Sequence, residues 1–249
     1  MKHAALWCAL LSAVLSLSTC KTQLQHEVNK RQYYQVDSSI VADSRIIDYY
    51  APYKQQLDAE MNRVIGISDH YLTHSRASES LMGNFFADAL LWKGKQLDPD
   101  VQASFSTKGG IRAELKAGEI TVGNIFQIMP FENMVSILTL HGADMLRWAD
   151  YMAKTGGQPA GGIKLVIKDD KVVEFLVQGK PVDPDAKYKL VTYDYLANGG
   201  DYVTCFDNVI ARQDYKQLVR ETLIEYVSDL TKQGKHIQAQ LDGRVQIIQ

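Results

Sequence analysis

The sequence has little of several features that mark particular classes of protein. Only three cysteines occur in 249 residues, and the 27 Lys and Arg residues are offset by 29 Asp and Glu, giving a formal net charge of −2. So few cysteines exclude a disulfide-dense small domain, and the lack of positive excess argues against binding to the phosphate backbone of nucleic acids. Hydrophobic residues make up 46 % and charged residues 22 %, which excludes a disordered tail or a collagen-like fibre. The composition is that of a globular chain long enough to bury a core.

Long hydrophobic runs are confined to the N-terminus. Lys2 and His3 form a minimal basic region, and residues 4–17 are almost wholly apolar, which is the length of a secretory signal and short for a membrane span. The run ends in Leu-Ser-Thr-Cys at 17–20, which resembles the lipobox of bacterial lipoproteins, although Thr19 departs from the Gly, Ala or Ser usual there. In such proteins the cysteine is diacylated and becomes the mature N-terminus.

The sequence therefore predicts a lipoprotein signal peptide over 1–19 and an exported protein anchored by lipid at Cys20, on the periplasmic side or at the cell surface. A plain signal peptide cleaved nearby is the alternative. Beyond the signal and Cys20 the sequence contains one further cysteine, Cys205, so the body has no cysteine pair with which to form an internal disulfide.

Hydrophobic periodicity predicts a mixed α/β body. Residues 20–43 are polar and predict a tether and a first strand, and residues 44–249 contain no linker and predict one domain. Helices are expected over 46–64, 81–92, 143–154 and 213–230, strands over 101–106, 134–140, 188–193 and 244–248, and a hairpin over 162–179 turning at Asp169 and Asp170. Because helices and strands mix without strict βαβ order, we expect an α/β fold of the mixed, α+β-like kind with a partly antiparallel sheet.

Each of these helices has apolar residues at helical spacing, which predicts the side that it buries. These residues are Ile47, Tyr50, Leu57 and Met61 in the first helix, Phe85, Phe86, Ala89 and Leu90 in the helix over 81–92, Leu146, Ala149 and Met152 in the helix over 143–154, and Leu218, Val219, Leu223, Val227 and Leu230 in the last.

Two short segments combine a backbone-shaping residue with a side chain suited to a ligand. In the loop after the strand over 101–106, Gly109 and Gly110 allow close approach of the backbone, and Arg112 offers a planar fork that suits phosphate. In the segment 129–133, Pro130 stiffens the chain that presents Phe131, although a lone aromatic is by default a core residue.

A third segment, Tyr-Leu-Ala-Asn-Gly-Gly-Asp, places an aromatic ring before a glycine turn and a carboxylate. Tyr195 precedes Gly199 and Gly200, and Asp201 follows them. An Asp in such a turn commonly bonds its own backbone, so a purely structural role is the alternative for Asp201.

Together the three segments resemble the C-terminal, substrate-binding domain of the 5′-nucleotidase family. The family pattern runs Asn-x-Gly-Gly-Ile-Arg, then Pro-Phe-x-Asn, then Phe-x-x-x-Gly-Gly-Asp, and residues 76–88 match a further Arg-x-x-Glu-x-x-x-Gly-Asn-x-x-x-Asp stretch. The resemblance covers essentially all of 44–249, in order. It implies a layered sandwich of mixed sheets flanked by helices.

The resemblance also implies a role for each matched position. Phe131 and Tyr195 would clamp a nucleobase, which is physically reasonable because base–aromatic stacking contributes ~1–3 kcal/mol. Asp201 would accept hydrogen bonds from ribose hydroxyls, and Arg112 and Arg76 would meet the phosphate. The remaining substrate-binding positions that the resemblance implies are Asn133, Gly109, Gly110, Gly199 and Gly200. For Arg76 an ion pair with Glu79 is the alternative.

Three positions depart from the family pattern. Thr107 replaces an Asn, Tyr202 stands where a Gly often follows the Asp, and Tyr195 replaces a Phe. These changes leave nucleotide binding as the expectation, but they leave base preference and affinity open.

The metal-binding blocks that the family uses for catalysis do not occur in this sequence. In that family they belong to a separate N-terminal domain whose two metal ions activate a water. Here Asp69, His70 and His74 form one cluster, and a solvated surface turn is the favoured interpretation of it, so we expect no metal or other cofactor in this chain.

Three functions therefore stay open. The first is the specificity domain of a split 5′-nucleotidase, in which a separate metallophosphatase chain holds the divalent metals and performs the hydrolysis. The second is a non-catalytic lipoprotein that binds nucleosides or nucleotides. The third is a degenerate structural module without a ligand. In the first two, we expect Phe131 and Tyr195 to face each other across a cleft.

Overall fold

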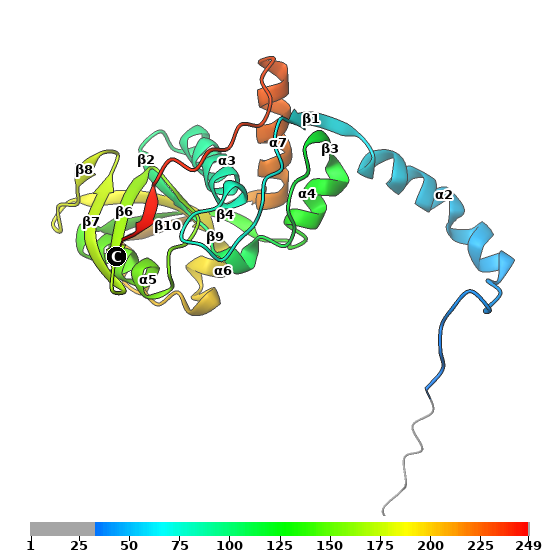
Figure 1. The fold of residues 1–249 in the computed structure, drawn as a ribbon, viewed down its shortest axis with the longest axis horizontal. Helices are drawn as coiled ribbons and strands as arrows, with labels where there is room; N and C mark the ends of the chain where they lie inside the picture. Colours follow the sequence, from blue (N-terminus) through cyan, green and yellow to red (C-terminus); the bar gives the residue numbers. More distant parts are fainter. Residues whose placement is uncertain (1–32, 249) are drawn as a thin grey trace, which may run out of the picture. The chain divides into compact units, whose positions relative to one another are not determined.

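A computed structural model describes residues 33–248 of the chain (Figure 1). The chain divides into two units between Ile47 and Asp48. Residues 33–43 contain turns and no strand, so the strand expected within 20–43 is not found in this part. Residues 20–32 lie outside the described residues, as do the predicted signal peptide and Cys20. Within the part that the structure describes, no helix has the length and apolar character needed to cross a membrane.

The described residues form three β-sheets. A two-stranded sheet pairs β1 (Val64–Ser68) with β3 (Gly118–Thr121). A five-stranded sheet has the order β10-β4-β9-β2-β5, comprising Ala211–Leu218, Met134–His141, Lys187–Tyr193, Val101–Phe105 and Ala160–Gly161. A four-stranded sheet has the order β11-β6-β7-β8, comprising Val245–Ile247, Ile163–Lys168, Lys171–Val177 and Lys180–Pro181. Both larger sheets contain parallel and antiparallel pairs, which confirms the expected mixed α/β fold.

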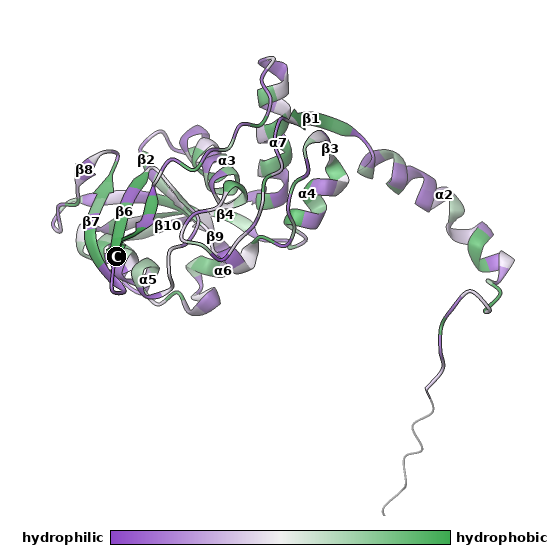
Figure 2. Ribbon diagram, viewed as in Figure 1, coloured by the Kyte–Doolittle hydropathy of each residue, from purple (hydrophilic) through white to green (hydrophobic). Residues whose placement is uncertain are grey.

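The described residues also form helices, most of which cover the sheets and close the core. They are α2 (Ser44–Met61), α3 (Leu81–Leu97), α4 (Val122–Ile128), α5 (Gly142–Lys154), α6 (Asp194–Ala197) and α7 (Val219–Lys232). The helix α3 contacts β2, β5 and β9 and also α7, whereas α5 contacts strands of both larger sheets (Figure 1). Phe86 and Leu90 of α3 are fully buried, as is Trp148 of α5. The apolar core therefore lies between the helices and the sheets, and β6 and β7 of the four-stranded sheet are largely hydrophobic (Figure 2).

The strand directions bring the motif segments to one edge of the five-stranded sheet. The strand β2 runs parallel to β9, with Ser104 opposite Val191, so both strands end at the same edge. The strand β4 is antiparallel to β9, with Val135 opposite Tyr193, so β4 begins where β9 ends. The chain after β2, before β4 and after β9 carries the three motif segments, which therefore meet although they are far apart in sequence.

Most of the predicted elements are present. The hairpin over 162–179 is confirmed as β6 and β7, and Asp169 and Asp170 both have the positive φ of a primed two-residue turn, at 51° and 57°. The strand expected at the C-terminus is confirmed as β11.

The helix expected over 213–230 is wrong in its first part. Residues Ala211–Leu218 form the strand β10, which pairs with β4 at the edge of the sheet, and α7 begins only at Val219. Most β10 side chains are exposed, so the local pattern carries little strand signal, and pairing with a neighbouring strand decides the structure. Leu223 and Val227 are buried as expected.

Two of the predicted buried faces also differ. Leu146 lies on the exposed side of α5, whereas Ala149 and Met152 are buried. The helix α2 is confirmed, but none of its residues is buried. Its mixed hydropathy is visible in Figure 2. An amphipathic pattern shows which side of a helix can be buried, and whether it is buried depends on a partner surface.

Candidate functional site

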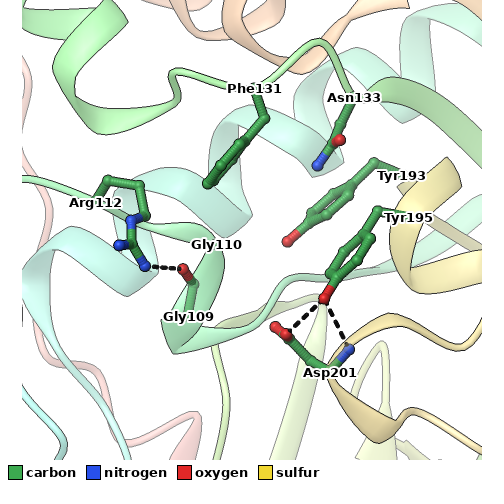
Figure 3. Close-up of a pocket in the computed structure, with 8 residues that line it drawn as sticks. All are labelled: Gly109, Gly110, Arg112, Phe131, Asn133, Tyr193, Tyr195 and Asp201. Carbon is green, nitrogen blue, oxygen red and sulfur yellow. Dashed lines mark hydrogen bonds between the residues drawn. The ribbon is translucent and has the colours of Figure 1, made fainter. Parts of the chain in front are cut away.

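A pocket of about 280 Å³ lies where the three motif segments meet. Its lining residues are Gly109, Gly110, Arg112, Phe131, Asn133, Tyr193, Tyr195 and Asp201 (Figure 3). Seven of these eight were singled out from the sequence, all except Tyr193. The structure thus brings the motif residues into one cavity, and their role in binding a ligand stays a prediction.

Two aromatic rings lie on two sides of this pocket. Phe131 is 40 % exposed and Tyr195 is 47 % exposed, so neither is a core residue. In Figure 3 the rings of Phe131 and Tyr195 are separated, and the ring of Tyr193 lies between them in this view. Half-exposed aromatic rings beside an open cavity offer apolar faces to a planar ligand.

The buried side of the pocket is formed by Tyr193, the last residue of β9. Its side chain is almost wholly buried, its hydroxyl lies 3.3 Å from Ser106 Oγ, and burial raises its pKa. A Cβ at Gly110 would collide with this hydroxyl, so the loop after β2 needs a glycine there to lie against the ring. Sequence reasoning missed Tyr193, although its place two residues before Tyr195 in a predicted strand was an available signal.

The carboxylate of Asp201 is held by two side chains, one from the loop after β2 and one from its own segment. Its Oδ2 accepts a hydrogen bond from Thr107 Oγ1, and its Oδ1 accepts one from the Tyr195 hydroxyl at 3.0 Å. The Tyr195 hydroxyl in turn accepts a hydrogen bond from Asp201 N at 3.2 Å (Figure 3). The Asp201 carboxylate therefore connects Thr107 and Tyr195 through their hydroxyls. It does not accept a hydrogen bond from the backbone of its own turn, which was the structural alternative. Thr107 and Tyr195 are two of the departures from the family pattern, and both donate a hydrogen bond to the Asp201 carboxylate.

The turn that carries Asp201 has an uncommon backbone. Asp201 and Tyr202 have φ of 53° and 59°, in the left-handed region, and follow Gly199 with φ of 86°. The carbonyl of Asp201 accepts a hydrogen bond from the hydroxyl of Tyr151 at 3.1 Å, and burial raises the pKa of Tyr151 to about 12. A neutral Tyr151 thus stays a donor to this turn throughout the physiological pH range.

Gly199 and Gly200 do not line the pocket but shape its wall. A Cβ at Gly200 would lie 2.5 Å from the ring of Tyr195, so this position must be glycine for the ring to lie where it does. Gly200 therefore sets the position of the Tyr195 ring, and Gly199 supplies a positive φ at the start of the turn.

The two arginines expected to meet phosphate are placed differently. Arg112 is exposed and lines the pocket, where its Nη1 donates to Gly109 O at 3.2 Å. Most of its guanidinium donors remain available to a ligand. Arg76 does not line the pocket. Its carbonyl accepts a hydrogen bond from Lys108 Nζ at 3.0 Å, which places its backbone beside the loop after β2.

The alternative ion pair between Arg76 and Glu79 is not formed. Glu79 instead accepts hydrogen bonds from the backbone N–H of Asp242 at 2.9 Å and of Gly243 at 3.0 Å. Asn84 Nδ2 donates both to Glu79 and to Gln240 O. The Glu and Asn of the segment over 76–88 therefore fasten the chain that leads to β11.

The cluster of Asp69, His70 and His74, the one candidate metal site in the sequence, does not form a ligand set. Asp69 Oδ1 lies 2.6 Å from His236 Nδ1, and burial lowers the pKa of His74. Among residues 33–248, no group of three or more His, Cys, Asp or Glu side chains is arranged to hold a metal ion.

The fold and the site define a class of protein: a mixed α/β domain with a small aromatic pocket at the edge of its central sheet, an arginine at the rim and a fixed carboxylate beside one ring. The family model described as "5′-nucleotidase, C-terminal domain" matches residues 58–208, and the chain belongs to this family.

Relatives and solved structures agree with that assignment. An apyrase of Tabanus yao is 28 % identical over 249 residues, which covers 86 % of this chain and 43 % of the relative. A cell wall protein of Listeria monocytogenes is 28 % identical over 219 residues, covering 77 % of this chain and 28 % of that protein. The crystal structure of a 5′-nucleotidase precursor from Thermus thermophilus matches with a TM-score of 0.70 and 26 % identity, covering 83 % of this chain and 43 % of that one. The chain thus spans less than half of the length of each of these proteins.

Proposed function

We propose that the pocket binds the base and sugar of a nucleotide or nucleoside, and that this chain acts as the nucleotide-binding specificity domain of a 5′-nucleotidase. The observation that carries the proposal is the pair of half-exposed rings, Phe131 and Tyr195, on two sides of one cavity. Stacking on an aromatic ring is tolerant of the base, because every base has an apolar face.

The polar lining of the pocket fits the rest of such a ligand. The Asp201 carboxylate accepts one protein hydrogen bond at each oxygen, which leaves acceptor capacity for ribose hydroxyls. Arg112 at the rim can meet a phosphate with a charge-assisted hydrogen bond.

We also propose that hydrolysis of the phosphate ester is performed by a metallophosphatase partner that supplies two divalent metal ions. Two such ions activate the attacking water and stabilise the leaving oxygen. Purified chain should then show no appreciable release of phosphate from AMP with Mg²⁺, Mn²⁺ or Zn²⁺. Activity that appears on adding a metallophosphatase chain supports the split enzyme, and robust activity of the chain alone contradicts it.

A lipoprotein that captures nucleosides without hydrolysis would use the same pocket. It is the second candidate, because capture of a nucleoside requires nothing beyond the rings and polar groups that line the pocket. Binding without partner-dependent hydrolysis would identify it. In either case we propose that the protein is exported and anchored by lipid at Cys20, on the periplasmic side or at the cell surface.

Calorimetric titration with adenosine and AMP tests the binding proposal. Phe131→Ala and Tyr195→Ala should each weaken binding by ~1–3 kcal/mol, about five- to 150-fold in Kd, because each removes one stacking face. Tyr53→Ala, which removes an exposed ring on α2, is the matched control and should bind as the unaltered protein does. Unchanged affinity in both pocket variants would refute the proposal.

A further inference from the structure

A buried arginine lies directly behind the segment that presents Phe131. Arg220 is in the first turn of α7, and only 9 % of its side chain is exposed. A buried charge costs free energy unless it is fully paired, and a cation at the N-terminus of a helix also opposes the helix dipole. The position is thus unfavourable for an arginine. The contacts of its guanidinium group explain why an arginine is present there.

The contacts of Arg220 converge on the Phe131 segment and on α4, which precedes it. Its Nη1 donates to Phe131 O at 3.2 Å, and its Nη2 donates to Glu132 Oε1 at 2.8 Å. Its guanidinium carbon lies 4.2 Å from the centre of the Phe126 ring, in cation–π geometry. The planar fork of one side chain thereby fixes two consecutive residues relative to α7.

Neighbouring contacts hold the same segment from two sides. The backbone N–H of Val219 donates to Asn133 O at 2.9 Å. Asp194 Oδ1 accepts from Met134 N at 3.1 Å and from Tyr195 N at 2.8 Å, which ties the start of β4 to the start of α6. These contacts hold Asn133 and Met134. The contact closest to the Phe131 ring is the one that Arg220 makes with the Phe131 carbonyl.

We infer that Arg220 is a positioning residue for ligand binding: it sets the place of the Phe131 ring through the Phe131 carbonyl. The ring is 40 % exposed and is not packed against the hydrophobic core, so its orientation depends on the backbone that carries it. Arg220 does not line the pocket and so acts on a ligand only through Phe131. This inference rests on the proposed function.

A double-mutant cycle on adenosine affinity tests the inference. Arg220→Gln should weaken binding by about three- to tenfold, but it should add nothing in a Phe131→Ala protein, because the ring that it positions is already gone. Arg244→Gln is the matched control: Arg244 is a partly buried arginine, with 13 % of its side chain exposed, that pairs with Asp88 and Asp242 outside the pocket, so it should leave Kd unchanged. Losses that multiply in the double variant would overturn the inference, as would an unaltered Kd in Arg220→Gln.

Arg220→Lys provides a second variant in case the glutamine variant does not fold. Lysine keeps the charge but cannot donate to Phe131 O and Glu132 in one plane, so a smaller loss of affinity is expected. If Arg220→Lys keeps full affinity while Arg220→Gln and Phe131→Ala are still coupled, donation by both guanidinium nitrogens is not what positions the ring.

A measurement without ligand separates this inference from the proposed function. In protein labelled with 4-fluorophenylalanine, the ¹⁹F resonance of Phe131 is assigned by its loss in Phe131→Leu. It should shift or broaden in Arg220→Gln and stay unchanged in Arg244→Gln. An unaffected resonance rejects the positioning role even if adenosine binds. A displaced resonance in a protein that binds neither adenosine nor AMP supports the positioning role and refutes the proposed function.

Discussion

Tyr202 has a left-handed backbone at a position where the family often has glycine. Its φ is 59° and its side chain is 91 % exposed, so the ring gains little burial to offset the strain. A left-handed backbone costs an L-residue roughly 1–2 kcal/mol relative to glycine. Part of this advantage of glycine is cancelled, because glycine also loses more conformational entropy on folding. The departure from the family pattern therefore keeps the turn and adds strain to it.

We expect Tyr202→Gly to raise the free energy of unfolding by ~0.5–1 kcal/mol, because glycine takes up this backbone without strain. Urea denaturation followed by circular dichroism measures it. Tyr202→Ala is the control, since alanine removes the ring and keeps the Cβ. A glycine variant no more stable than the alanine variant would contradict the account.

Individual side chains also show what sequence reasoning could reach in the site. Local glycine and proline patterns marked the segments of Phe131, Tyr195 and Asp201, and the resemblance to the family pattern then implied a role for each of them. Arg220 and Asp194 could not be named, because their partners lie 89 and 60 residues away in sequence and no local pattern encodes such a pair.

At the scale of elements, the segment that leads into α3 fastens the C-terminal part of the chain. Glu79 accepts hydrogen bonds from Asn84, Asp242 and Gly243, two of which are backbone donors 163 and 164 residues away. A carboxylate suits this place because both of its oxygens only accept.

Replacing Glu79 by Gln should therefore destabilise the fold by ~1–3 kcal/mol, because the amide nitrogen faces backbone donors and leaves one unsatisfied. Thermal unfolding measures the change, and adenosine affinity should not alter, since Glu79 does not line the pocket. Glu119→Gln, at an exposed position of β3, is the control. Equal stability of the two variants would show that the hydrogen bonds at Glu79 contribute nothing.

The helix α2 illustrates an element whose type was predictable and whose packing was not. Its apolar spacing predicted a helix, and Ser44–Met61 is one, but it buries none of its residues. The opposite error occurred at β10, where exposed side chains gave no strand signal and pairing with β4 decided the structure. Burial and strand pairing both depend on distant parts of the chain, which a local pattern does not contain.

Because a helix without tertiary packing is marginally stable in water, the backbone amides of α2 should exchange with solvent far faster than those of α3. Hydrogen–deuterium exchange with mass spectrometry on the full chain should show a difference of about two or more orders of magnitude. The buried helix α3 serves as the internal reference. Protection of α2 equal to that of α3 would mean that a surface covers it in solution.

At the scale of the whole molecule, the proposed lipid anchor at Cys20 would hold the domain at a membrane. Cys20→Ala should move the protein from the membrane fraction to the soluble fraction, because it removes the thiol that would be acylated. Cys205→Ala is the control: Cys205 is buried and lies outside the predicted lipobox, so its replacement should leave the fractionation unchanged. Fractionation unchanged by Cys20→Ala would exclude the lipoprotein.

The antiparallel pairing of β4 and β9 has a consequence for engineering the ligand preference of this domain. One register, with Val135 opposite Tyr193, sets how far apart the two ring-bearing segments start. Directed evolution toward larger or smaller ligands should therefore randomise the segments outside the strands, 129–133 and 195–202, and keep the paired residues constant. Libraries confined in this way keep the pairing of β4 and β9 and vary only the segments that line the pocket, so a large share of their members should fold.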